Sequence, residues 1–160
     1  MKETQTNIER LGEWIDLYQD QLFRYAFYRL GNHADAEDVL QDAFLKVASS
    51  SKEIRNPKAY LYSAVASGCV DMLRRRGKSL SIDDKLPSAH HTDREDAEEE
   101  FRRIDQLLRK LPEQQSEVIR LHIHANLKFT EIADILEQPV TTIKSRFASG
   151  IEKLRKQFIN

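Results

Sequence analysis

The chain of 160 residues has one cysteine, Cys69, which excludes an internal disulfide and a cysteine-rich zinc site. Cys69 lies within an apolar helical pattern, so we expect a buried free thiol. Only five glycines and four prolines are present, too few for a sheet-rich or repeat architecture. No apolar run is long enough to cross a bilayer, and none follows a basic start. These absences favour an all-α, soluble and cytoplasmic protein without membrane insertion.

Motifs for catalysis are absent as well. The sequence has no glycine-rich phosphate loop, nucleophile elbow or paired-carboxylate motif. His90 and His91 lack cysteine or acidic partners at metal-binding spacing. His122 and His124 would point in different directions on a helix and make a poor chelate. We therefore predict no metal site, no cofactor and no enzymatic activity.

Charge is unevenly distributed along the chain, although the formal net charge is only -1. Residues 1–77 carry 11 cations and 11 anions, residues 78–100 carry 3 and 8, and residues 101–160 carry 11 and 7. A neutral block, an acidic connector and a basic block indicate two small helical domains, 1–77 and 98–160, with a flexible acidic linker over 78–97. The near-neutral total predicts weak non-specific DNA affinity for the isolated chain.

Apolar residues repeat at helical spacing over 8–30, and Gly31-Asn32 ends this pattern with residues that tolerate left-handed geometry. A second helix follows at once, and a third covers about 58–76 after the turn signal Asn56-Pro57. Helical periodicity resumes at 98–111, and Pro112 begins another helix.

The end of the chain, 127–155, contains two short amphipathic helices with a break that ends at Pro139. A proline at or just before a first helical turn loses no hydrogen bond. The polar face of the second helix carries small, hydroxylated or cationic side chains: Thr141, Thr142, Lys144, Ser145, Arg146 and Ser149. An ordinary hairpin with a solvated face is the simpler alternative. The residue types favour a helix-turn-helix whose second helix reads the DNA major groove.

The third predicted helix has aromatic residues at its start, Tyr60 and Tyr62, and three arginines at its end, Arg74 to Arg76. Bases stack on aromatic rings and phosphates pair with arginine, so this order is compatible with single-stranded nucleic acid. Core tyrosines and a basic end favoured by the helix dipole are the alternative, and on composition alone they are the simpler interpretation.

Three motifs, in this order, resemble bacterial sigma factors of the extracytoplasmic-function (ECF) group, in the sigma-70 family. The first is G-N-x-x-D-A-E-D-x-x-Q-D-A-F-L-K-V over 31–47, similar to the core of sigma region 2. The second is R-N-P-K-A-Y-L-Y over 55–62 with D-M-L-R-R-R over 71–76, similar to the promoter-melting and minus-ten segment. The third is L-P-E-Q-Q-S-E-V-I-R-L over 111–121, followed by F-T-E-I-A-D-I-L and V-T-T-I-K-S-R, similar to region 4. The resemblance covers nearly the whole chain.

The resemblance implies a role for each of three residue sets. Docking on the beta-prime clamp helices of core RNA polymerase falls to Asp35, Glu37, Asp38, Gln41 and Asp42. Capture of the open minus-ten strand falls to Asn56, Lys58, Tyr60, Tyr62, Ser67, Arg74, Arg75 and Arg76. Recognition of the minus-thirty-five element falls to the six polar residues of the final helix. The beta flap of the polymerase, promoter DNA and an anti-sigma factor are the implied partners.

Some residues depart from the family pattern. Tyr60 stands where tryptophan is frequent, and Ala66-Ser67 where Arg-Asn is frequent, so the melted sequence preferred here is expected to be unusual. Glu137 replaces the glycine often found in the helix-turn-helix turn, which is expected to strain or reshape that turn. Two other hypotheses are a stand-alone helix-turn-helix regulator and a nuclease. The missing carboxylate cluster for metal ions argues against the nuclease.

Overall fold

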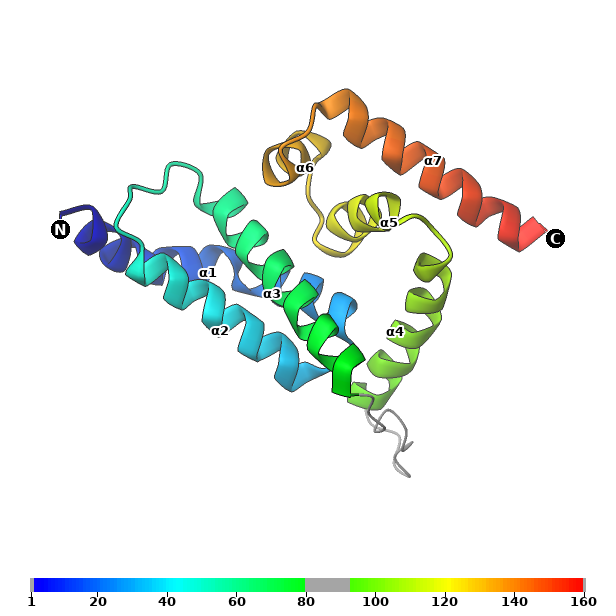
Figure 1. Cartoon of the computed structure of the whole chain (residues 1–160), viewed down its shortest axis with the longest axis horizontal. Coiled ribbons are helices and arrows are strands. Elements are labelled where there is room, and N and C mark those ends of the chain that lie inside the picture. Colours follow the sequence, from blue (N-terminus) through cyan, green and yellow to red (C-terminus); the bar gives the residue numbers. More distant parts are fainter. Residues whose placement is uncertain (1, 80–92, 160) are drawn as a thin grey trace.

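The computed structural model describes residues 2–79 and 93–159, and every regular element in these two ranges is a helix. Figure 1 shows their order along the chain. The elements are α1 (Lys2–Leu30), α2 (His33–Ser49), α3 (Pro57–Ser79), α4 (Asp93–Arg109), α5 (Glu113–Ile119), the π-helical turn η2 (Arg120–His124), α6 (Phe129–Leu136) and α7 (Val140–Ile159). The all-α prediction is confirmed. None of these helices has the length and apolar character needed to cross a membrane.

Helices α1, α2 and α3 form a three-helix bundle (Figure 1). Gly31 ends α1 with a φ of 73°, and Asn32 caps α2 by accepting a hydrogen bond from the Asp35 amide at 2.9 Å. Asn56 caps α3 in the same way through the Ala59 amide at 3.1 Å. The predicted breaks between these helices are therefore confirmed, with a physical cause for each.

The bundle core is dominated by large side chains from α1 and α3. Trp14, Leu22, Leu61 and Val65 are at most 2% exposed. Cys69 is buried among them as predicted, and burial raises the pKa of its thiol to about 12. The thiol is therefore protonated and unreactive at neutral pH.

The second half of the chain folds around α7, which contacts α5 and α6. Helices α6 and α7 form the predicted helix-turn-helix, and the turn between them reverses at Glu137. Glu137 adopts a left-handed conformation, with φ 54° and ψ 48°, and the Gln138 amide bonds the Ala133 carbonyl at 3.1 Å. This is the helix end that glycine usually supplies. Glu137 thus keeps the shape of the turn and bears its steric strain.

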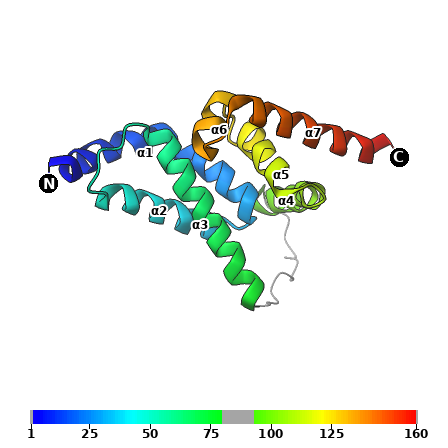
Figure 2. The same ribbon diagram turned by 45° about the horizontal axis from the view of Figure 1, so that its top comes forward.

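The two halves are in direct contact. Helix α1 contacts η2, and α3 contacts α6 (Figures 1 and 2). One apolar core runs from the bundle into the helix-turn-helix. Phe101 of α4 also closes over Gly31, where an added Cβ would lie 2.3 Å from the Phe101 ring. Both ends of the segment predicted as a linker are helical, since α3 continues to Ser79 and α4 begins at Asp93. The rest of the predicted flexible linker, residues 80–92, lies outside the described residues.

Candidate nucleic-acid interface

Helix α7 presents the predicted DNA-reading face to solvent. Its apolar side turns inward, where Ile143 is fully buried and the Phe147 ring lies 5.2 Å from that of Phe129. Of the six predicted residues, four are exposed (Thr141, Lys144, Ser145 and Ser149) and two are half-buried (Thr142 and Arg146). The Pro139 carbonyl accepts the Thr142 and Ile143 amides at 3.0 and 3.1 Å, so the first turn is firmly built. The arrangement offers hydroxyl and cationic donors on one side of a helix.

The residues predicted to capture the minus-ten strand are spread along α3 and are unequally accessible. Tyr60 is 37% exposed, whereas Tyr62 is fully buried with its ring 6.1 Å from that of Tyr25. Burial raises the pKa of Tyr62, and the nearby Glu131 carboxylate raises it further. Lys58 is paired with Glu131 at 2.6 Å. In this arrangement Tyr62 is a core residue, and a base could stack on it only after a rearrangement.

At the other end of α3 the three arginines differ. The Arg74 side chain is 66% exposed and lies 3.7 Å from Asp71, and Arg75 is also exposed. Arg76 donates to the Leu30 carbonyl at 2.8 Å and forms an ion pair with Asp35. This pair joins a residue predicted to bind DNA to one predicted to face the polymerase. Asp35 and Arg76 thus hold α2 and α3 together in the structure.

The other predicted polymerase-facing residues, Glu37, Asp38, Gln41 and Asp42, are exposed on α2. Two of them, Glu37 and Gln41, line a groove of about 500 Å³ between α1 and α2, with Phe23, Leu40 and Phe44 among its apolar residues. Acidic and amide groups above an apolar groove are suited to a partner helix that carries both apolar and basic side chains.

Sequence reasoning missed one residue of this surface. Leu45 is 65% exposed, and it lies one turn beyond Gln41 and Asp42 on the outer side of α2. The sequence pattern could have identified Leu45 as an outward-facing residue, because it does not belong to the apolar set of α2 that includes Ala43 and Val47. An exposed leucine among acids is a candidate anchor for a partner.

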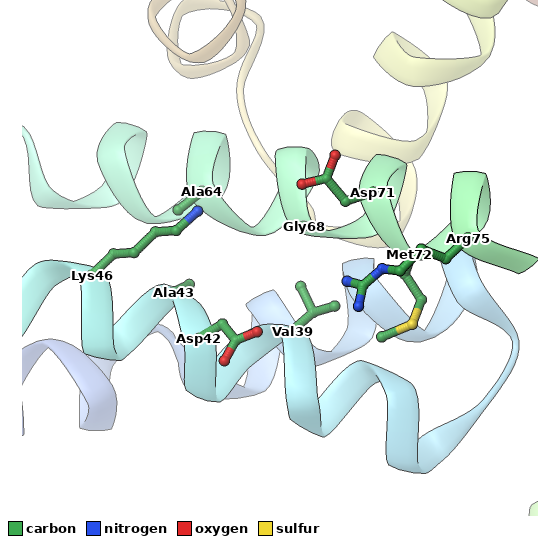
Figure 3. Close-up of a pocket in the computed structure, with 9 residues that line it drawn as sticks. All are labelled: Val39, Asp42, Ala43, Lys46, Ala64, Gly68, Asp71, Met72 and Arg75. Carbon is green, nitrogen blue, oxygen red and sulfur yellow. The ribbon is translucent and has the colours of Figure 1, made fainter.

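A second, smaller groove of about 250 Å³ lies between α2 and α3. Figure 3 shows Met72 and Arg75 extending from α3 toward α2, and Lys46 extending from α2 toward α3. At Gly68, which lines this groove, an added Cβ would lie 2.9 Å from a Val39 methyl. Gly68 therefore serves close helix packing. The groove is lined by charged side chains of both signs, which do not favour one class of ligand.

The two histidines of η2 have separate neighbours. His122 Nδ1 lies 2.8 Å from the Leu127 carbonyl, and its ring stacks on Phe129 at 4.3 Å. His124 stacks on Tyr28 across the contact between the two halves, with ring centroids 4.0 Å apart and an interplanar angle of 6°. His122 and His124 therefore act as packing residues at two separate positions in the structure.

Comparisons with known proteins identify the family of the chain. Residues 14–79 match the family model described as Sigma-70 region 2, and residues 101–154 match that described as Sigma-70, region 4. The ECF RNA polymerase sigma factor SigW of Bacillus subtilis (strain 168) is 31% identical over 166 residues, which cover 93% of this chain and 89% of SigW.

Solved structures show the same fold. CnrH in complex with the cytosolic domain of CnrY has a TM-score of 0.70 at 19% identity, covering 98% of this chain and 92% of CnrH. RpoE in complex with the anti-sigma factor NepR from Bartonella quintana has a TM-score of 0.64 at 23% identity, covering 93% and 96%. The family models, the SigW relationship and the fold together establish that the chain belongs to the sigma-70 family, as an RNA polymerase sigma factor of the ECF group.

Proposed function

We propose that this chain brings core RNA polymerase to a subset of promoters and initiates transcription there, without being an enzyme itself. The observation that carries the proposal is the presence of two surfaces suited to DNA, on α3 and α7, beside an acidic and apolar polymerase-facing surface on α2. We place this activity in the cytoplasm, where bacterial RNA polymerase works.

The two halves divide the work. Helix α2 docks on the beta-prime clamp helices through Glu37, Asp38, Gln41 and Asp42, with Leu45 as an apolar anchor. Helix α7 enters the major groove of the minus-thirty-five element, and the second half also meets the beta flap. Helix α3 receives the open strand of the minus-ten element. There, aromatic rings stack on bases that have left the duplex, and cationic side chains neutralise the phosphates in place of counterions.

An anti-sigma factor is the proposed regulator. RpoE, which shares the fold, was solved with the anti-sigma factor NepR. The groove between α1 and α2 and the exposed Leu45 offer a protein partner apolar surface whenever polymerase is absent. A partner seated there would compete directly with polymerase.

The decisive experiment is run-off transcription of sheared genomic DNA from the source organism, with and without the chain added to core polymerase. Mapped start sites should share two upstream sequence elements, and they should appear only when both proteins are present. Specific DNA binding by the chain alone, with no gain on adding core polymerase, would instead favour the stand-alone regulator.

Arg146→Ala tests the assignment of α7. It should weaken recognition of the upstream element by about 1–3 kcal/mol if the guanidinium makes a good base contact. Binding to core polymerase should be unchanged. Lys153→Ala is the matched control, since Lys153 is an exposed cation of the same helix outside the predicted reading face. Loss of polymerase binding in the Arg146 variant would show that the surface is wrongly assigned.

A further inference from the structure

Asn7 is a buried polar side chain near the start of α1, with only 2% of its surface exposed. Its carboxamide nitrogen donates to two backbone carbonyls, that of Ser50 at 3.3 Å and that of Lys52 at 2.9 Å. Both carbonyls belong to the loop 50–56 that joins α2 to α3, and this loop lies beside the first turns of α1 (Figures 1 and 2). The start of the chain is therefore tied to a loop more than 40 residues away in sequence.

The loop 50–56 has no regular secondary structure, yet its backbone is fixed at several points. Ile54 inserts into the bundle core with 6% of its surface exposed, and Asn56 caps α3. At the other end of the loop the Lys52 amide donates to the Ser50 hydroxyl at 3.3 Å, and Asn7 holds the carbonyls of the same two residues. Asn7 thus fixes the half of the loop that Ile54 and Asn56 do not reach.

The side chains between these fixed points face solvent. They comprise a hydroxyl, a carboxylate and two cations, all exposed: Ser51, Lys52, Glu53 and Arg55. Groups of these kinds hydrogen-bond the edges of unstacked bases and pair with phosphates. The loop leads directly into Asn56 and Tyr60 of the proposed minus-ten surface. Contacts with a base must be held to about 0.5 Å, so a loop that takes part in them needs one fixed backbone shape.

We propose that Asn7 is a positioning residue for promoter recognition. By holding the Ser50 and Lys52 carbonyls, it fixes the loop 50–56 in the shape that receives one base of the open minus-ten strand. The inference rests on the proposed function, because it uses the assignment of the start of α3 to that strand. Asn7 is itself buried and touches no DNA, so it acts through the loop.

The chemistry of the site requires an amide at this position. Two carbonyl oxygens face one nitrogen, and the carboxamide group of asparagine carries two N–H donors on that atom. Asn7→Asp keeps the size of the side chain but exchanges the donors for carboxylate oxygens, which the two carbonyls repel. Asn7→Ala removes the donors without adding a charge. The two variants should therefore release the loop in different ways and with the same consequence for DNA.

The test uses holoenzyme assembled from the full chain and core polymerase. The probe is a fluorescent single-stranded oligonucleotide with the minus-ten sequence of the mapped start sites, together with copies that each lack one base. For the wild type, the copy without the captured base should bind about ten-fold weaker, the scale of one base contact. Either Asn7 variant should bind the complete strand about ten-fold weaker. Removing the captured base should then cost these variants nothing further, because both changes act through the same contact.

Two controls separate positioning from stability. Leu11→Ala removes apolar packing against the bundle core one turn after Asn7, and an apolar side chain has no hydrogen bond to the loop to lose. This variant should melt at a lower temperature, yet its holoenzyme should lose affinity on removal of the captured base as the wild type does. Both Asn7 variants should keep wild-type affinity for core polymerase and, in holoenzyme, for duplex DNA that carries the minus-thirty-five element alone.

Three results would overturn the positioning role of Asn7. The first is wild-type affinity of both variants for the complete strand, and the second is a full further loss when the captured base is removed. The third is the same base-specific effect in Leu11→Ala, which would make Asn7 an ordinary stabilising residue. Failure of wild-type holoenzyme to bind the strand at all would instead overturn the proposed function.

Discussion

His124 should make the stability of the folded chain depend on pH. Its ring is stacked on Tyr28, and among the described residues its buried Nδ1 has no hydrogen-bond partner. Burial lowers the pKa of the imidazole to about 4, helped by the cations of Arg24 and Arg120, against 6.5 in an unfolded chain. The unfolded state therefore binds the proton first as pH falls. The contribution of His124 to the free energy of unfolding is fully present above pH 6.5 and is lost progressively between pH 6.5 and pH 4. Below pH 4 this group causes no further loss.

The two pKa values give the size of the effect. Between pH 7.5 and pH 5.0 the protonation of His124 should remove about 2 kcal/mol from the free energy of unfolding. Urea denaturation followed by circular dichroism at both pH values measures this loss. His124→Phe keeps a ring on Tyr28 without a titrating group, so its pH dependence should be smaller by that amount. The reasoning would be refuted if the phenylalanine variant lost as much stability as the wild type.

Two other substitutions test particular features of the fold and of the proposed surface. Glu137→Gly should raise the free energy of unfolding by about 1 kcal/mol, because glycine adopts φ 54° without the steric cost borne by glutamate, and a thermal melt that does not move upward would contradict this. Leu45→Gln should weaken core-polymerase binding about ten-fold while leaving the melting temperature unchanged. Leu17→Gln, at a leucine that is 59% exposed on α1, is its control, and equal losses in both variants would remove Leu45 from the polymerase-facing surface.

Local chemistry explains why the helices could be predicted. Each break depends on residues within one turn of it, such as the left-handed Gly31, the Asn32 cap and the Asn56-Pro57 start of α3. The buried Cys69 followed from the same periodicity. The outward face of α7 was equally accessible to prediction, since apolar spacing fixes which side of an amphipathic helix turns inward.

Accessibility along α3 could not be predicted in this way. Tyr60 and Tyr62 are two residues apart in an aromatic segment, yet one is 37% exposed and the other is fully buried. The sequence predicts that both rings can receive a base. Which ring is free depends on what α1 and α6 place against α3. The same holds for Arg76, whose partner Asp35 comes from another helix.

The sequence by itself determined the family motifs, the helices with their caps, and the polar face of the helix proposed to read DNA, because these depend on neighbours within a few residues. Only the tertiary structure decided that the two halves close on each other. Tyr25 and Glu117 are 92 residues apart, and Lys58 and Glu131 are 73 apart. Each of these side chains looks like an ordinary surface or core residue within its own helix. Their pairing depends on the relative placement of the two halves, which no local periodicity encodes.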